Sequence, residues 1–121
     1  KVRLERESFY NKGKKRSLAR DQKKQKRLLA IFNQKRIIPS LDRFILHQAN
    51  HRIIHSAANK LKIPRDKIFE NVQVYGNTSG ASVAICMAEM LEKGLLKRGM
   101  RAVACGFGAG LTYGSVLFTV G

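Results

Sequence analysis

The sequence predicts an α/β domain with helices packed on a sheet in residues 41–121, preceded by a basic segment in residues 1–40. Short apolar runs alternate with stretches in which apolar residues recur at helical spacing. Glycine, proline and asparagine mark the boundaries between these stretches. The expected order of elements is β-α-β-α-β-β.

The first strand and helix are predicted around His47. The apolar run Phe44-Ile45-Leu46 ends at His47 and is typical of a buried strand. A helix is expected next, with Asn50 as its N-cap and Pro64 beyond its end. Its apolar face comprises Ile53, Ile54, Ala57, Ala58 and Leu61.

A second pair of elements follows. Val72 and Val74 alternate with polar neighbours, which predicts a short strand. A helix is expected after Asn77 and should end at Gly94, because glycine favours the left-handed conformation of a helix end. Its apolar face comprises Val83, Cys86, Met87, Met90 and Leu91.

A hairpin closes the domain. Ala102–Cys105 is typical of a buried strand, and Leu111–Val120 predicts the last strand, antiparallel to it. The glycine-rich segment Gly106–Gly110 between them is expected to be a tight turn with unusual backbone angles.

Positive charge is concentrated in residues 1–40. The net charge is +16, of which +11 lies in residues 1–40. We expect Lys1–Lys26 to be mobile or loosely helical, and such a density of charge attracts polyanions. A nucleic-acid-binding protein acting through residues 1–40 is therefore an alternative function, although only Phe9 and Tyr10 lie nearby for base stacking. The basic residues are Lys12, Lys14, Lys15, Arg16, Arg20, Lys23, Lys24, Lys26 and Arg27.

The compartment is expected to be cytoplasmic. Cys86 and Cys105 are spaced like core residues, which fits a reducing compartment. No run of 18 or more apolar residues occurs, and the basic N-terminus lacks the apolar stretch of a secretory signal. Because the first residue is not Met, we expect a processed or partial chain.

Three segments have the residue types of a catalytic site at the end of a sheet. His47-Gln48-Ala49-Asn50 places an imidazole beside a helix N-terminus, which disfavours an extra proton on the ring. Gly76-Asn77-Thr78-Ser79 offers a carboxamide donor, and Gly106–Gly110 allows main-chain N–H groups to approach a ligand. Taken singly, these segments are typical of a helix cap, a turn and a hairpin.

Taken together, the three segments closely resemble the signature blocks of the β-ketoacyl-acyl-carrier-protein synthase III family. The similarity runs from about Leu41 to Val120 and includes the continuation Leu111-Thr112-Tyr113-Gly114-Ser115. It implies half of a thiolase-like fold with a mixed sheet. It also implies an acyltransferase of fatty acid biosynthesis, which condenses acetyl-CoA or another acyl-CoA with malonyl-acyl-carrier protein.

The resemblance assigns roles to single residues. His47 and Asn77 match the catalytic His and Asn, which stabilise an enolate oxygen. Asn50 matches a residue near the pantetheine arm, and Phe107 one that lines the active site. Two further positions are Arg52, which matches a docking site for acyl carrier protein, and Ala109, whose N–H matches the oxyanion hole.

The family's nucleophilic Cys lies in the other half of the enzyme, which has no counterpart here. Cys86 and Cys105 are expected to be inert core residues, so the isolated chain should be inactive. If the enzyme is split, the expected partner is an N-terminal half on another chain. The alternatives to a split enzyme are a gene fragment and a frameshifted product. A homodimer is not expected, because the family's dimer contacts lie largely in the missing half.

No cofactor or metal is expected. His47, His51 and His55 have the spacing of one helix face, which is an alternative prediction of a Zn²⁺ or Ni²⁺ site. Against it, His47 precedes the predicted helix, and no acidic or cysteine partner is near in the sequence.

Overall fold

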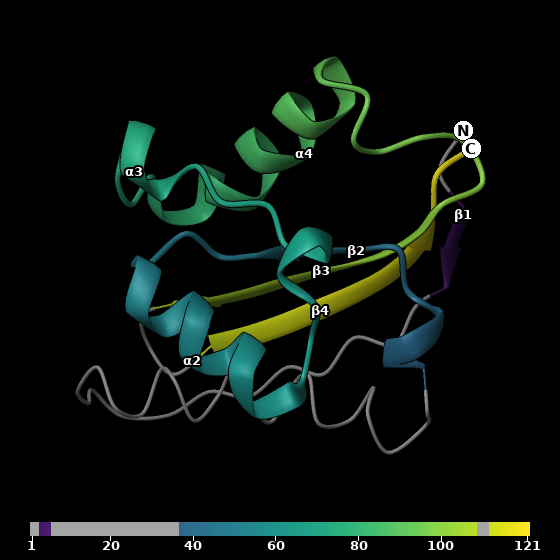
Figure 1. Ribbon diagram of the computed structural model, residues 1–121. Coiled ribbons are helices and arrows are strands. Elements are labelled where there is room, and N and C mark those ends of the chain that lie inside the picture. The colour runs from purple at the N-terminus through teal and green to yellow at the C-terminus, as the bar shows by residue number, and fades with distance from the viewer. Residues whose placement is uncertain (1–2, 6–36, 109–111) are drawn as a thin grey trace.

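The computed structural model describes residues 3–5, 37–108 and 112–121. In these ranges a four-stranded sheet in the order β1-β4-β3-β2 lies between helices on its two faces (Figure 1). The strands are β1 (Arg3–Glu5), β2 (Arg43–Leu46), β3 (Arg101–Gly108) and β4 (Thr112–Thr119).

The sheet is mixed, as expected. β2 pairs with β3 in parallel, whereas β3 and β4 form the predicted antiparallel hairpin. The N–H of His47 donates to the carbonyl oxygen of Cys105 at 2.8 Å, so pairing continues past the end of β2. The carboxyl end of β2 therefore lies beside the last residues of β3.

The hairpin differs from the prediction at its glycines. Gly106, Phe107 and Gly108 are not a tight turn but the end of β3. They pair with Gly114, Tyr113 and Thr112. The ladder hydrogen bonds of β4 hold the backbone extended here, although glycine by itself has no such preference.

Strand β1 falls within the segment expected to be mobile or loosely helical. Arg3–Glu5 pairs antiparallel with Leu117–Thr119 of β4, so the prediction is wrong for these residues. A charged sequence does not prevent pairing, because the ladder uses only backbone groups of the neighbouring strand. The other residues of Lys1–Lys26 lie outside the described ranges.

Helix α2 (His51–Leu61) covers one face of the sheet. Its predicted N-cap is confirmed, because Oδ1 of Asn50 accepts a hydrogen bond from the N–H of Ile53 at 3.0 Å. The predicted face supplies Ile53, Ile54, Ala57 and Ala58 to the core. The chain then turns through the left-handed residue Lys62 (φ 55°) before Pro64 and the 3₁₀ turn η2 (Arg65–Lys67).

Helix α4 (Ser82–Glu92) covers the opposite face, with Cys86 and Met90 buried against the sheet (Figure 1). The predicted end at Gly94 is confirmed: its φ is 66°, and the N–H of Leu95 returns to the carbonyl oxygen of Met90 at 2.8 Å. Leu91 was expected in the core but is 53% exposed, because it follows Met90 by about 100° of helix rotation.

The segment Val72–Tyr75 is a short helix, α3, and not the predicted strand. The side chain of Gln48 explains the difference. Its Oε1 accepts from the N–H of Asn71 at 3.0 Å and of Val72 at 3.1 Å, which satisfies the start of the helix. The order from β2 onward is thus β-α-α-α-β-β, with 3₁₀ turns η1 (Ile38–Ser40) before β2 and η3 (Ser79–Ala81) before α4.

The core has two layers, one on each side of the sheet. Phe44 and Leu46 face α2, whereas Ile45 between them faces α4. This alternation is the side-chain period of a strand buried on both faces. Among the described residues, none of the helices has the length and apolar character that crossing a bilayer requires.

Candidate active site

His47 lies directly after β2 and is 8% exposed. Its Nδ1 is 2.5 Å from Oγ of Ser82, the first residue of α4. The ring of Phe107 meets the imidazole edge-on, with centroids 4.9 Å apart and planes at 89°. Contacts from α4 and β3 therefore fix the orientation of the imidazole at the end of the sheet.

Ser82 is a site residue that the sequence analysis missed. It is buried, and its Oγ also accepts a hydrogen bond from the N–H of Gln48 at 3.3 Å. A serine hydroxyl has one proton to donate. If that proton goes to Nδ1 of His47, the ring proton is on Nε2. The signal was in the spacing, since Ser82 precedes Cys86 and Met90 at intervals of four on the buried face of α4.

Asn77 lies in the connection between α3 and α4. Its Oδ1 accepts from the N–H of Ser79 at 2.9 Å, an Asx turn, and the residue is exposed. Gly76 has φ 68° and ψ −160°, a conformation that is essentially restricted to glycine. The turn η3, which follows Asn77, lies against β3 and α4. The connection therefore runs past the strand that carries Phe107.

The other predicted residues have different positions. Phe107 lies beside His47, and its role in lining an active site stays a prediction. Asn50 is half-buried and uses its Oδ1 as the cap of α2, and Arg52 is exposed on the first turn of that helix. Ala109 lies outside the described residues.

Buried hydrogen bonds of Gln48 and Asn71 hold the backbone next to His47. Gln48 is 1% exposed and its Nε2 donates to the carbonyl oxygen of Leu46 at 2.8 Å. Asn71, held by Gln48, donates from Nδ2 to Glu89 at 2.9 Å and accepts from the thiol of Cys86 at 3.1 Å. These hydrogen bonds tie the end of β2 to the start of α3 and the middle of α4.

Neither cysteine has the environment of a nucleophile. Burial, and then the nearby carboxylate of Glu89, raise the pKa of Cys86 to about 11. Burial alone raises the pKa of Cys105 to about 12. Both thiols are therefore protonated near neutral pH. Their predicted place in the core is confirmed, since both are free and buried.

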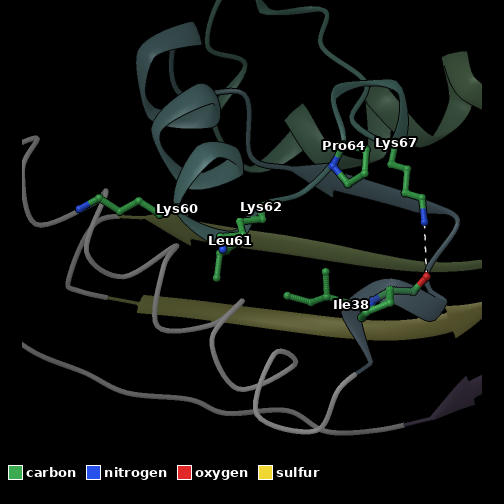
Figure 2. A pocket seen from close by; sticks show the side chains of 7 residues that line it. Ile38, Lys60, Leu61, Lys62, Pro64 and Lys67 are labelled. Atoms are coloured by element: carbon green, nitrogen blue, oxygen red, sulfur yellow. Dashed lines mark hydrogen bonds between the residues drawn. The ribbon is translucent and has the colours of Figure 1, made fainter.

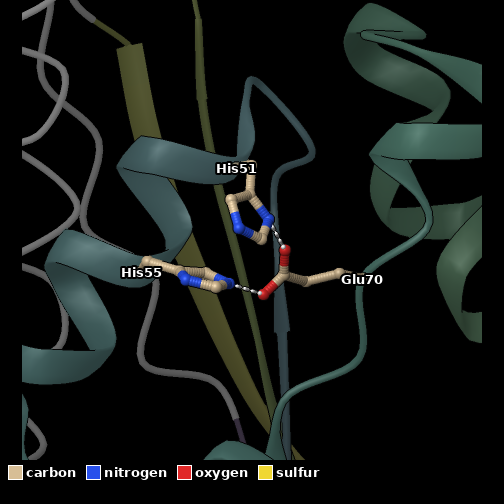
Figure 3. A group of neighbouring side chains, drawn as sticks. All are labelled: His51, His55 and Glu70. Atoms are coloured by element: carbon tan, nitrogen blue, oxygen red, sulfur yellow. Dashed lines mark hydrogen bonds and ion pairs between the residues drawn. The ribbon is translucent and has the colours of Figure 1, made fainter.

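A second group of titratable side chains consists of His51 and His55 of α2 and of Glu70, which lies on a neighbouring segment (Figure 3). Glu70 contacts both His51 and His55, one with each carboxylate oxygen. The alternative set of three histidines does not form, because the group of neighbouring ligand atoms among the described residues consists of His51, His55 and Glu70, without His47. No acidic partner is near in the sequence, but the fold supplies one, since Glu70 contacts both His51 and His55.

A hollow of about 620 Å³ lies at the other end of α2 (Figure 2). Lys67 spans its rim and donates from Nζ to the carbonyl oxygen of Leu41 at 2.8 Å. His47 precedes the start of α2, about 16 Å away along the helix axis, so this hollow is separate from the His47 site. It is lined by Ile38, Pro39, Lys60, Leu61, Lys62, Pro64 and Lys67.

Sequence comparisons cover the domain that carries His47. A family described as "3-Oxoacyl-[acyl-carrier-protein (ACP)] synthase III C terminal" matches residues 37–120. The chain is 54% identical over 80 residues to the beta-ketoacyl-[acyl-carrier-protein] synthase III of Clostridium acetobutylicum, covering 66% of this chain and 25% of that protein. The enzyme of the same name from Trichodesmium erythraeum is 48% identical over 81 residues, covering 67% of this chain and 25% of that protein. The chain thus spans about a quarter of the length of these curated relatives.

Solved structures agree with the sequence comparisons. The 3-oxoacyl-[acyl-carrier-protein] synthase III of Aquifex aeolicus superposes with a TM-score of 0.79 at 29% identity, covering 98% of this chain and 43% of that one. The synthase III of Thermus thermophilus gives a TM-score of 0.77 at 30% identity, covering 88% and 35%. The expected fold class, part of a thiolase-like α/β fold with a mixed sheet, is confirmed.

Proposed function

The chain belongs to the family of 3-oxoacyl-[acyl-carrier-protein] synthase III C-terminal domains, and from this membership we propose that it is the C-terminal part of a condensing enzyme that initiates fatty acid synthesis. The observation that carries the proposal is the buried His47 at the carboxyl end of β2, held between Ser82 and Phe107 within the matched region.

In the proposed reaction, malonyl-acyl-carrier protein loses CO₂ and its thioester becomes an enolate. The carbon of that enolate attacks an acyl group bound to a cysteine thiol, and the thiolate leaves. Negative charge develops on the enolate oxygen, and fixed hydrogen-bond donors lower the barrier most when they already point at it. We assign this role to Nε2–H of His47 and to the amide NH₂ of Asn77.

Ser82 and Phe107 support this assignment through their effect on His47. A proton donated by Ser82 to Nδ1 leaves the ring proton on Nε2, which makes that nitrogen a donor. The edge-on contact with Phe107 covers one side of the imidazole with an apolar ring. A donor in an apolar environment interacts more strongly with charge than one in water.

Substrate binding is assigned to the start of α2. Arg52 is exposed on the first turn, where a guanidinium is available to the acidic surface of acyl carrier protein. Residues 41–121 have a net charge of +5, which favours the encounter with an acidic partner. The NH₂ group of Asn50 is directed to the pantetheine arm in this proposal, while its Oδ1 caps the helix.

The nucleophile is assigned to a part of the enzyme outside this chain. Cys86 and Cys105 are protonated because their pKa values are raised to about 11 and about 12. The chain therefore supplies the donors of the condensation step but not the thiolate, and by itself it condenses nothing.

A chimeric enzyme tests the proposal. Residues 41–121 would replace the matching segment of the Clostridium acetobutylicum relative, which supplies the rest of the enzyme. We expect condensation of acetyl-CoA with malonyl-acyl-carrier protein. Substituting His47→Ala or Asn77→Ala should lower kcat by about 10²- to 10³-fold, as expected for the loss of an oxyanion donor.

Asn59→Ala is the matched control, because Asn59 is exposed on α2 and has no assigned role. Its kcat should equal that of the unsubstituted chimera. Intact mass after incubation with acetyl-CoA shows whether the chimera has folded with a working nucleophile. A chimera that carries the acetyl group but condenses it equally well without His47 would refute the role given to this residue.

A further inference from the structure

His51, His55 and Glu70 bring three metal-ligand atoms within 4.8 Å of one another. Nδ1 of His51 is 2.8 Å from Oε2 of Glu70, and Nε2 of His55 is 2.6 Å from Oε1. Both imidazoles project from the same side of α2, with ring centroids 3.6 Å apart, and Glu70 reaches them from the segment before α3 (Figure 3). We propose that these three side chains form a binding site for a divalent transition-metal ion, with Zn²⁺ as the reference ion.

The ligand set suits that chemistry. Two imidazole nitrogens and one carboxylate oxygen are an established donor set for Zn²⁺ with an open fourth position for water. In a tetrahedral site, with bonds of about 2.0–2.2 Å, neighbouring ligand atoms are about 3.4 Å apart. The observed separations are close enough that rotations of the side chains bring the atoms into place.

The backbone on both sides of the site is already held. His51 and His55 lie one turn apart on a helix whose start is fixed by the cap from Asn50. On the other side, Gln48 binds the N–H groups of Asn71 and Val72, immediately after Glu70. Binding an ion therefore orders side chains only, which keeps the entropic cost low.

Access to the site is uneven. The side chain of His51 is 65% exposed, whereas those of His55 and Glu70 are 24% and 17% exposed. An ion enters from the His51 side and keeps water in its open position. Such a site exchanges its ion with solvent, unlike a closed structural site with four protein ligands.

Arg65 opposes the ion in the structure as it stands. Its Nη1 lies 2.5 Å from Nδ1 of His55 and 2.7 Å from Nε2, so a positive charge occupies the edge of the site. Arg65 is exposed on η2 and can move into solvent when an ion binds. Its displacement costs affinity, and removal of its charge should therefore strengthen metal binding.

Calorimetric titration of the untagged chain with ZnCl₂ tests the proposal. We expect one Zn²⁺ per chain, and about tenfold or greater weakening in His55→Gln and in Glu70→Gln. Arg65→Gln should strengthen binding about fivefold, which corresponds to removing a like charge worth about 1 kcal/mol. Glu92→Gln, at an exposed carboxylate of α4, is the control for the lost charge and should leave the affinity unchanged.

Titration with CoCl₂ gives an independent readout. Two imidazoles, one carboxylate and water should give the intense visible absorption of a four-coordinate Co²⁺ site, and His55→Gln should abolish it. Stoichiometric binding that survives both His55→Gln and Glu70→Gln would overturn the proposal, as would the absence of any binding to the unsubstituted chain or to Arg65→Gln.

Discussion

At the scale of single residues, the position of His47 depends on groups that come from distant parts of the chain. Ser82 contacts its Nδ1, and the ring of Phe107 lies perpendicular to the imidazole. Ser82 also binds the N–H of Gln48, so one hydroxyl serves two groups at the end of β2. Removing the hydroxyl of Ser82 should therefore affect both the stability of the protein and the tautomer of His47.

Substituting Ser82→Ala should leave Nδ1 of His47 and the N–H of Gln48 without this partner. Because both groups are buried, we expect the free energy of unfolding to fall by about 1–3 kcal/mol in urea denaturation. The ¹⁵N NMR shifts of His47 should show a mixture of tautomers in place of one. Ser82→Thr keeps the hydroxyl and should restore a single tautomer.

Ser56→Ala on α2 is the control for the loss of a serine hydroxyl, and should change stability by less than about 0.5 kcal/mol. An unchanged tautomer signal in Ser82→Ala would show that Ser82 does not position the imidazole.

From the raised pKa values of the two cysteines we expect a loss of stability at alkaline pH. In the unfolded chain the pKa of a cysteine has its ordinary value of 9.0, whereas the folded pKa of Cys86 is raised to about 11 and that of Cys105 to about 12. The folded chain therefore binds more protons than the unfolded chain above pH 9, and the free energy of unfolding falls as pH rises from about 9 toward 11. The contribution is fully present below pH 9.

Urea denaturation between pH 8 and 11 measures this effect, with Cys86→Ala and Cys105→Ala as comparisons in which the fall should be smaller. At pH 7 iodoacetamide should leave both thiols of the native chain unmodified and label both in urea, as read by intact mass. Rapid labelling of either thiol in the native chain would contradict the assignment of these residues as inert.

At the scale of elements, α2 combines a structural cap with the proposed binding functions. Its N-cap was predictable because asparagine before an apolar helical pattern has a local cause. The end of α4 at Gly94 was predictable for the same kind of reason. α3 was not predictable, since the acceptor that satisfies its first N–H groups is Gln48, which is far away in sequence.

Variants of Asn50 separate its structural role as a helix cap from its proposed role in binding the pantetheine arm. Asn50→Ala should lower the free energy of unfolding by about 1 kcal/mol, since the cap is removed. Asn50→Asp keeps an oxygen for the N–H of Ile53 but removes the NH₂ donor. In the chimeric enzyme, Asn50→Asp should retain stability and lose about tenfold in kcat/KM, which corresponds to one hydrogen bond to the pantetheine arm.

Thermal denaturation and steady-state kinetics of the two variants decide this question. If Asn50→Asp were as active as the unsubstituted chimera, the pantetheine role would be excluded and the cap alone would explain the residue.

At the scale of the whole molecule, most of the net positive charge lies outside the segment that matches the family. Residues 1–40 carry +11 of the net +16, whereas the family match spans residues 37–120. The proposed boundary between a basic segment and a condensing-enzyme domain near residue 40 stays a prediction, as does nucleic-acid binding through that segment.

Neutralising part of the basic segment tests the nucleic-acid prediction while leaving β1 intact. Replacing Lys12, Lys14, Lys15 and Arg16 by Gln should weaken binding of a labelled single-stranded RNA. The slope of log K against log salt should become shallower by about 0.7 for each phosphate that is no longer neutralised.

The matched control neutralises four exposed basic residues of the domain, namely Lys60, Lys62, Lys97 and Arg98. Fluorescence anisotropy from about 50 to about 200 mM salt measures both variants, and an equal weakening would assign binding to overall charge.

The sequence by itself determined the family, the buried strand runs Phe44-Ile45-Leu46 and Ala102–Cys105, the helix capped by Asn50 and the end of α4 at Gly94. These depend on apolar period and on caps within a few residues. The sequence motifs also predict His47, Asn77 and Phe107 as site residues, and the placement of Asn77 beside the other two stays a prediction. Only the tertiary structure decided that Ser82 holds His47, that Gln48 starts α3, that β3 continues through Gly106 and that Glu70 joins His51 and His55. Each of these depends on a hydrogen bond or ion pair between residues far apart in the chain, and such pairs leave no periodic signal in the sequence.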